Sequence, residues 1–221
     1  GKNMFVYRDT KNGDIYLCTL NNGSWSKPKA IKEINTSFHE SSACFSSDMS
    51  SIYYVSDQPG GFGGRDIYKT TLLESGEWGV PENLGNIINT EYNEERVQLS
   101  HDGSILYFAS KGHNTMGGYD VFRSERKEDG SWSSPVNMGY PVNTVDDDFS
   151  YVPTEDGGFG YYASTREDGL GDRDLYIVYF RDYELKKLQS FKQLEVNISH
   201  KLDSINEHLE KWEELKSDDP E

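Results

Sequence analysis

The hexapeptide GGRDIY at residues 63–68 is followed by two variants of itself, GGYDVF at 117–122 and GDRDLY at 171–176. Each copy begins 54 residues after the previous one. The same interval separates three dipeptides, Asn35-Thr36, Asn89-Thr90 and Asn143-Thr144. Because several motifs recur in one order and at one interval, we interpret the chain as an array of 54-residue structural repeats.

Residues 95–148 illustrate one repeat. A first strand, a, at RVQLS leads to a turn at Asp102-Gly103, and a second strand, b, follows at ILYFAS. After a glycine-rich loop, strand c is YDVFRSER, and a DGSW turn leads to strand d around WSSPVNM. Asp-Gly pairs favour tight hairpins, because glycine tolerates a positive φ. Each complete repeat is therefore predicted to form four short antiparallel strands.

Strand b indicates how the repeats pack. Ile105, Tyr107 and Ala109 alternate along it with Leu106 and Phe108, so both faces of the strand are apolar. A sheet with one face in water would alternate apolar and polar residues, so both faces of this sheet must be covered. Four-stranded antiparallel sheets that pack face to face around an axis form a β-propeller. The predicted fold class is thus an all-β propeller, followed by a C-terminal α-helix.

The repeat sets predicted boundaries for the blades of a propeller domain over residues 1–180. A partial blade with strands b, c and d is followed by two complete blades and a partial blade with strands a, b and c, over residues 1–40, 41–94, 95–148 and 149–180. Gly1 aligns with Gly103, the turn glycine inside a blade. Two interpretations follow: a fragment of a larger propeller, or a small four-bladed ring with two three-stranded outer blades. We favour the fragment, because the alignment places the start of the chain at a turn.

Three aspartates, Asp66, Asp120 and Asp174, occupy the same position of the hexapeptide. Each precedes strand c, where every blade needs the same turn. A short carboxylate that accepts hydrogen bonds from nearby backbone N–H groups stabilises such a turn. We therefore interpret this recurring aspartate as structural.

The composition excludes several classes of protein. A formal net charge of −16 argues against nucleic-acid binding, which needs clustered Lys and Arg, and its ordinary consequence is solubility. No apolar run is long enough to span a membrane, and the chain shows no signal peptide. Cys18 and Cys44 lie in strand-like runs without metal-type or redox-type spacing, so we expect buried small hydrophobic residues rather than a disulfide.

Residues 181–216 differ in character from the repeats. Four residues lie seven apart, and leucines occupy positions between them: Phe191, Ile198, Ile205 and Trp212, with Leu188, Leu202 and Leu209. This spacing predicts an amphipathic helix with a heptad-like seam. The seam would cover an exposed blade, the interpretation we favour, or support self-association of the 185–215 helix as a coiled coil. Residues 217–221 are predicted to form a disordered tail.

Catalytic and cofactor motifs were sought along the whole chain. The sequence contains no Gly-x-Ser-x-Gly elbow, no His-Glu-x-x-His pair and no phosphate-binding loop. The three aspartates at 146–148 lack the alternating ligands of a calcium loop. We therefore expect no catalytic residue, no metal site and no cofactor.

The topology of a propeller places the b–c loops and the d–a loops on one face of the ring. The b–c loops carry an apolar residue at the same position of each repeat: Phe62, Met116 and Leu170. An acidic residue recurs just before strand a: Glu40, Glu94 and Asp148. A half-ring of carboxylates near the axis would attract a cation or a basic peptide. We favour a packing role for both sets, because a residue needed in every blade is explained by the packing of every blade.

Residues that depart from the repeat are better candidates for a binding site. Arg65 and Arg173 lie where the middle blade has Tyr119, and His113 belongs to the b–c loop of that blade alone. All four are in predicted loops or at their ends, where binding residues concentrate.

The motifs LSHDGSILYFAS, GGYDVF and WSSPVNMGYPVNT closely resemble the TolB-like propeller repeats, a WD-like family with a Ser-x-Asp-Gly turn. The resemblance covers about residues 1–180. It implies a protein of the bacterial periplasm or outer membrane. Relatives often carry an OmpA-like peptidoglycan-binding domain, which this chain does not show.

The resemblance and the missing catalytic motifs lead to one preferred function. We expect a non-enzymatic scaffold module that binds an envelope protein or glycan through the loop face. The alternative is a propeller-type hydrolase or lyase, or the substrate-gating propeller of a peptidase. That alternative requires acids or bases unique to one blade that converge on the axis.

Overall fold

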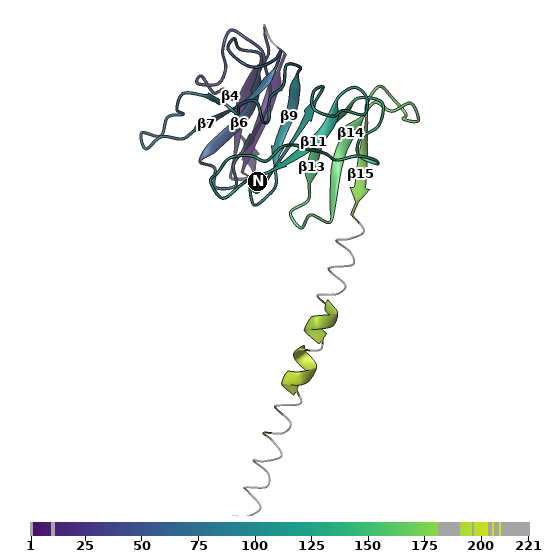
Figure 1. Cartoon of the computed structure of the whole chain (residues 1–221). Coiled ribbons are helices and arrows are strands. Elements are labelled where there is room, and N and C mark those ends of the chain that lie inside the picture. The colour runs from purple at the N-terminus through teal and green to yellow at the C-terminus, as the bar shows by residue number, and fades with distance from the viewer. Residues whose placement is uncertain are drawn as a thin grey trace, which may run out of the picture. The chain divides into compact units, whose positions relative to one another are not determined.

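The computed structural model (Figure 1) divides into two compact units, Gly1–Val178 and Tyr179–Glu221. The structure describes residues 2–9, 12–180, 191–195, 197–202, 205 and 208. The first unit is built entirely of β-strands, and the described part of the second is helical.

The first unit contains four antiparallel sheets, which we call blades 1 to 4 in chain order. Blade 1 consists of β1 (Asn3–Arg8), β2 (Asp14–Asn21), β3 (Ser24–Trp25) and β4 (Lys29–Ala30). Blade 2 consists of β5 (Glu40–Phe45), β6 (Ser51–Ser56), β7 (Asp66–Thr71) and β8 (Glu82–Asn83). Blade 3 consists of β9 (Glu94–Leu99), β10 (Ile105–Ser110), β11 (Asp120–Glu125) and β12 (Val136–Asn137). Blade 4 consists of β13 (Asp148–Pro153), β14 (Phe159–Ser164) and β15 (Asp174–Tyr179).

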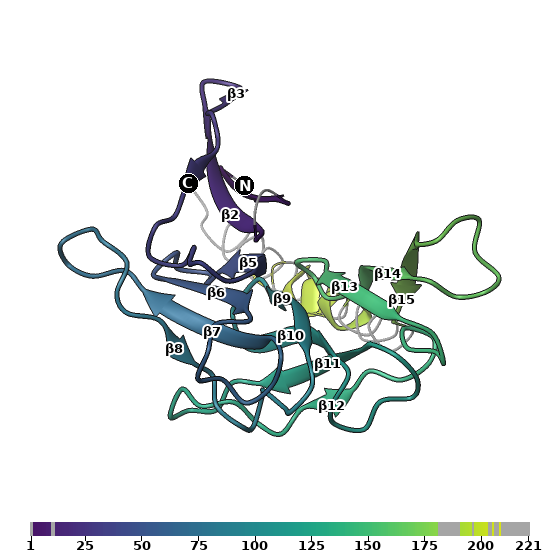
Figure 2. The ribbon, with the colours of Figure 1, turned by 90° about the horizontal axis from the view of Figure 1, so that it is seen from above.

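The blades follow one another around a common axis, as the view from above shows (Figure 2). Strands β5, β9 and β13, which are of type a, lie at the centre, and neighbouring blades contact one another through them. No strand of blade 1 contacts a strand of blade 4 in the part of the chain that the structure describes. The predicted propeller is confirmed, and its blades 1 and 4 each keep one face that no other blade covers.

The strands agree with the repeat most closely at strand b, where β10 covers ILYFAS, residues 105–110. Strand d was expected over 132–138, but β12 contains only Val136 and Asn137. The outermost strand of blade 1 is similarly short, because Pro28 separates β3 from β4 and cannot donate to the ladder. Short outermost strands are a common way to limit pairing at a sheet edge.

The hydrophobic core lies between blades rather than inside one sheet. Between blades 2 and 3, Val55, Ile67, Leu106, Phe108 and Phe122 are at most 1% exposed and form one cluster. A second cluster joins blades 1 and 2, and a smaller one joins blades 3 and 4. The expectation from strand b, that both faces of a blade are covered, is confirmed for the inner blades.

The two cysteines are buried and unpaired, as predicted. They lie on different strands, Cys18 on β2 and Cys44 on β5. Burial raises the pKa of the Cys44 thiol to about 12, so this side chain stays protonated and behaves as a small apolar group.

In the second unit, residues 191–195 and 197–202, together with Ile205 and His208, are helical (Figure 1). The rest of the helix predicted over 181–216, and the tail 217–221, lie outside the described residues. The described apolar residues of this helix are each about half exposed: Phe191, Leu194, Ile198, Leu202 and Ile205. None of the described helical residues belongs to a helix long and apolar enough to cross a bilayer.

Candidate functional site

The b–c loops are held by the recurring aspartate at the start of strand c. Asp66 accepts hydrogen bonds from the backbone N–H groups of Phe62 (2.6 Å) and Gly63 (3.1 Å). Asp120 accepts the N–H of Met116 in the same way, and Asp174 accepts that of Leu170, each at 2.5 Å. The structural interpretation of this aspartate is confirmed. Its consequence is that every loop presents one apolar residue at a defined position.

These three apolar residues point into solvent. Phe62 is 52% exposed, Met116 48% and Leu170 100%. The packing role that the sequence favours for these residues therefore does not describe Leu170, whose side chain is fully exposed. Exposed apolar side chains on a rigid loop are available for binding.

The glycine pair of the hexapeptide allows the next blade to approach. A Cβ atom on Gly63 would lie 2.1 Å from the carbonyl oxygen of Tyr92, and one on Gly117 would lie 2.1 Å from that of Val145. Both oxygens belong to the d–a loop that precedes the next blade. The repeated glycines therefore bring the b–c loop of one blade against the d–a loop of the next.

The three acidic residues before strand a are completely buried, at 0% exposure each. Glu94 accepts hydrogen bonds from the backbone N–H of Thr90 (3.1 Å) and from the hydroxyls of Thr90 (2.8 Å) and Ser110 (2.7 Å). Glu40 repeats these contacts in blade 2, and burial raises the pKa of both carboxyls. Asp148 is held by Thr144 in the corresponding way. These carboxylates stabilise the d–a loops and present no charged ring to solvent.

Two of the residues that depart from the repeat connect neighbouring blades. Arg65 of blade 2 forms an ion pair with Glu95 of blade 3. Tyr119 of blade 3 packs on Phe149 of blade 4, with ring centroids 4.8 Å apart. Arg173 lies over the same Phe149 ring, at 4.3 Å. Arg65 and Tyr119 are therefore at blade junctions, whereas the contact of Arg173 with Phe149 lies within blade 4.

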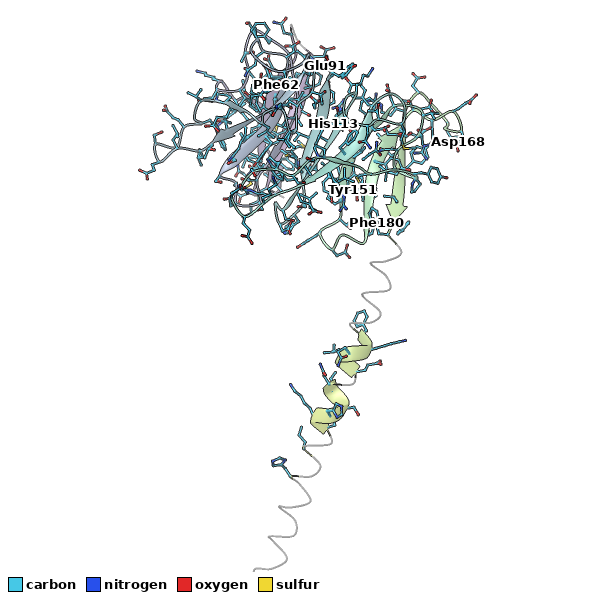
Figure 3. All side chains as sticks on the ribbon, in the orientation of Figure 1. Phe62, Glu91, His113, Tyr151, Asp168 and Phe180 are labelled. Atoms are coloured by element: carbon cyan, nitrogen blue, oxygen red, sulfur yellow. The ribbon has the colours of Figure 1, made fainter. Side chains whose placement is uncertain are left out.

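A pocket with a volume of about 750 Å³ lies on the loop face between blades 2 and 3. Its lining joins four segments: Phe62 from one b–c loop, His113 and Asn114 from the next, the d–a loop 86–92, and Ser134 and Pro135 just before β12. Three of its apolar residues are about half exposed: Phe62, Ile87 and Tyr92. Figure 3 shows Phe62, Glu91 and His113 at the same end of the propeller. Of the residues predicted for a site, Phe62 and His113 are thus brought together, and the others lie outside this lining.

His113 has a fixed position in the pocket. Its ring packs against Phe122, with centroids 5.2 Å apart, and against Phe108, at 6.0 Å. Its Nε2 atom lies 3.0 Å from the carbonyl oxygen of Ile88, to which it donates a hydrogen bond. Partial burial lowers the pKa of the imidazole, so His113 is neutral at pH 7. The histidine is therefore an uncharged, rigid part of the wall.

Sequence reasoning selected Glu94 at the end of this d–a loop but missed the residues of the loop that line the pocket. Thr90 and Glu94 make hydrogen bonds that recur in the other repeats. The residues near them in this loop, Ile87, Glu91 and Tyr92, differ from one repeat to the next. That variation was the available signal, since residues that depart from the repeat are the better candidates for a site. Among the described residues, no group of three or more His, Cys, Asp and Glu side chains has a geometry suited to a metal ion.

The four stacked antiparallel sheets, three with four strands and one with three, define the first unit as a β-propeller. Its fold is that of the TolB-like propellers. A TolB of Agrobacterium tumefaciens aligns with a TM-score of 0.54 and 19% identity over 81% of this chain and 58% of that chain. TolB from Acinetobacter baumannii aligns with a TM-score of 0.51 and 17% identity, over 80% of this chain and 38% of that chain.

The chain spans less than two thirds of the length of either TolB structure. At these identities the likeness shows the fold. No protein-family model matches the chain, and no curated protein sequence matches it either.

Proposed function

We propose that this chain is a non-enzymatic binding module of the bacterial cell envelope, periplasmic or associated with the outer membrane. In this proposal an envelope protein or glycan binds in the pocket between blades 2 and 3. The observation that carries the proposal is the pocket itself, which joins the exposed aromatic residues Phe62 and Tyr92 from two different loops. Its envelope location rests on the resemblance to TolB-like repeats.

The chemistry of the lining limits the ligand. Phe62, Ile87 and Tyr92 offer half-exposed apolar surface, which suits an apolar side chain or the face of a sugar ring. Glu91 carries a negative charge, and the lining contains no Lys or Arg. The chain as a whole has a net charge of −16. A neutral or cationic ligand is therefore favoured over an anionic one.

The position of His113 supports a binding role rather than catalysis. A general base in a hydrolase is typically hydrogen-bonded to the nucleophile that it activates or to a carboxylate that orients it. The Nε2 atom of His113 is instead 3.0 Å from a backbone carbonyl. This hydrogen bond serves to hold the ring in the wall of the pocket.

The test uses two pocket variants and one matched control. Phe62→Ala and Tyr92→Ala each remove an exposed aromatic ring from the lining. Met116→Ala changes the residue at the same position of the next repeat, which is equally exposed but outside the lining. Immobilised chains are exposed to a bacterial envelope extract and to an array of envelope glycans. Bound material is then identified by mass spectrometry or by its position on the array.

We expect the same partner to bind to the wild-type chain and to Met116→Ala, and to bind at least tenfold more weakly to both pocket variants. Equal binding to all four chains would place the site elsewhere. Hydrolysis of an envelope glycan or peptide by the purified chain, abolished by Glu91→Gln, would favour the enzymatic alternative. Fractionation of cells that produce the protein tests its envelope location separately.

A further inference from the structure

The junction between blades 2 and 3 has a second pocket, at the end of the propeller opposite to the loop face. We call this end the turn face, because it carries the a–b turns, residues 46–50 in blade 2 and 100–104 in blade 3. The pocket has a volume of about 180 Å³. Pockets for drug-sized molecules measure roughly 300–1,000 Å³, so this one suits a single small chemical group.

Two cations line this pocket, one from each blade. Lys69 belongs to β7 of blade 2, and Arg126 directly follows β11 of blade 3. Neither side chain forms an ion pair with any residue that the structure describes. Lys69 Nζ lies 5.9 Å from the centre of the Tyr53 ring, which leaves its charge without a counterion. Two like charges that share a pocket repel each other, so an anion between them would be stabilised.

Asp48 is the acidic residue among the described residues of this lining, and its charge is used within its own turn. Its carboxylate accepts hydrogen bonds from the hydroxyl of Ser46 (2.6 Å) and from the hydroxyl and N–H of Ser50 (2.8 Å and 3.0 Å). These bonds lower the pKa of Asp48 to about 2. Because Asp48 forms no ion pair with either cation, it does not take the place of a bound anion.

Two hydroxyl groups add neutral donors to the lining. Tyr53 is 2% exposed, and its hydroxyl has no hydrogen-bond partner in the described part of the chain. Burial raises the pKa of Tyr53, against the opposing charge of Arg126, so the phenol keeps its proton. Ser47 lies where the two a–b turns meet, since a Cβ atom on Gly103 would be 3.1 Å from its Oγ. A buried donor without a partner is costly, and an acceptor in the pocket would satisfy it.

We infer that this pocket binds a phosphate group, either free or as part of a larger molecule. Arginine pairs with the oxygens of a phosphate through its planar fork, and lysine contributes a point charge. A phosphate group carries roughly 1.5–2 negative charges at pH 7 and has at least three acceptor oxygens. It therefore matches two cations and two hydroxyl donors better than a carboxylate, which has one charge and two oxygens. This site is separate from the loop-face pocket, whose lining has no Lys or Arg.

The next junction shows that the cations are not required by the packing of blades. The pocket at the same place between blades 3 and 4 is lined by equivalent residues of the following repeat. Its described lining includes Glu155 but no Lys or Arg. Phe180 is the equivalent of Arg126, and Arg123, the equivalent of Lys69, lies outside that lining. Two converging cations are thus a feature of one junction, as expected of a site rather than of the repeat.

The experiment measures the ³¹P NMR line width of inorganic phosphate titrated with the full chain at pH 7 and low ionic strength. Lys69→Gln and Arg126→Gln each remove one charge from the lining, and Lys69→Arg keeps the charge. Arg123→Gln is the matched control, because it removes a cation from the equivalent position outside both pockets. Phe62→Ala changes only the loop-face pocket. Thermal unfolding establishes that each variant is folded.

We expect the wild-type chain, Lys69→Arg, Arg123→Gln and Phe62→Ala to bind phosphate with similar affinity. Lys69→Gln and Arg126→Gln should each bind about tenfold more weakly or worse, because each loses a charged hydrogen-bond donor. Added NaCl should weaken binding to the wild-type chain.

Competition experiments distinguish the sources of the phosphate. Displacement of inorganic phosphate by glucose 6-phosphate supports a site for phosphate esters, and a failure to displace it supports a site for the free ion. Acetate that competes as well as glucose 6-phosphate would overturn the preference for phosphate. No binding to the wild-type chain, or equal binding to Lys69→Gln, Arg126→Gln and the wild-type chain, would overturn the inference.

Discussion

At the junction between blades 2 and 3, Arg65 pairs with Glu95, whereas Tyr119 stacks on Phe149 at the junction between blades 3 and 4. The residues occupy the same two positions of the repeat. The backbone bonds beside them are also equivalent: Glu94 N–H donates to the Arg65 carbonyl (2.8 Å), and Asp148 N–H donates to that of Tyr119 (2.6 Å). The same backbone junction therefore carries an ion pair between blades 2 and 3 and an aromatic pair between blades 3 and 4.

The buried carboxylates differ between the two junctions in a similar way. Glu94 reaches the hydroxyl of Ser110 at 2.7 Å. Asp148 is one methylene shorter, and in blade 4 the equivalent Ser164 hydroxyl instead accepts a hydrogen bond from Arg166 Nε at 3.0 Å. The Arg166 guanidinium also lies 3.5 Å from Asp148 Oδ1. Arg166 thus supplies the contact that the shorter Asp148 side chain cannot make. Blade 4 therefore keeps the arrangement of the repeat although the acidic residue at this position has changed.

The largest expected effect concerns the apolar core between blades 2 and 3. Phe108→Ala should lower the free energy of unfolding by about 3–5 kcal/mol, because it leaves a cavity among fully buried side chains. Tyr161→Ala removes an aromatic ring of similar size from the exposed face of blade 4 and should change it by less than about 1 kcal/mol. Urea denaturation followed by tryptophan fluorescence measures both. Equal losses would show that the exposure of Tyr161 does not reflect its packing in solution.

The second effect tests the compensation by Arg166. Arg166→Ala removes the cation beside the buried Asp148 and the hydrogen bonds to Ser164 and to the Pro141 carbonyl. We expect a loss of about 2–4 kcal/mol in the free energy of unfolding, because a buried carboxylate is left without its partner. Gln58→Ala changes the equivalent position of blade 2 and is the control, with an expected change within about 0.5 kcal/mol. A loss no greater for Arg166 than for Gln58 would contradict the compensation.

The third effect separates the two kinds of junction by their response to salt. A double-mutant cycle on Arg65 and Glu95 should give a coupling energy of about 0.5–1 kcal/mol that decreases as NaCl is added, because Arg65 is partly exposed. The same cycle on Tyr119 and Phe149 should give about 0.5–1.5 kcal/mol with little dependence on salt. Couplings that respond equally to salt would show that the ion pair contributes through packing alone.

The smallest effect is a difference in pH dependence. Burial raises the pKa of Glu94, so the folded chain keeps this proton at a pH where the unfolded chain has lost it. Stability contributed by the residue therefore falls as the pH rises through the raised pKa. Relative to Glu94→Gln, the wild-type chain should lose stability between pH 4 and pH 7.

Asp102, in the same blade as Glu94, should show the opposite dependence of stability on pH. Hydrogen bonds from Ser100 and Ser104 lower its pKa to about 2, so its contribution is present above the ordinary carboxyl pKa and is lost as the pH falls toward 2. Relative to Asp102→Asn, the wild-type chain should gain stability as the pH rises from 2 to 4. Denaturation series at these pH values check both signs, and the same sign for both residues would refute the assignment.

Much of the propeller was predictable because its information is local and repeated. The two-faced apolar pattern of 105–110 predicts a covered strand, and the recurring Asp66 predicts the turn that the structure confirms. The pocket was predictable only in part. Phe62 and His113 were among the candidates, but Ile87, Glu91 and Tyr92 were not, since they are brought beside them by the contact between two loops.

Other assignments required the packed structure. Phe62, Met116 and Leu170 form a regular series that suggests packing, yet the first two are about half exposed and Leu170 is fully exposed. Arg65 and Tyr119 stand out from the repeat as potential ligand contacts, but each has its partner on the following blade. A sequence pattern does not reveal which residue of the next repeat a side chain meets.

By itself, the sequence of this protein determined the blade, its four strands and their order around an axis, because these depend on turns and on alternating apolar residues within 54 positions. Only the tertiary structure decided which repeated residues are covered and which are free. Tyr53, Tyr107 and Tyr161 are the same residue in the same strand, and their exposure differs because burial is a property of the neighbouring blade.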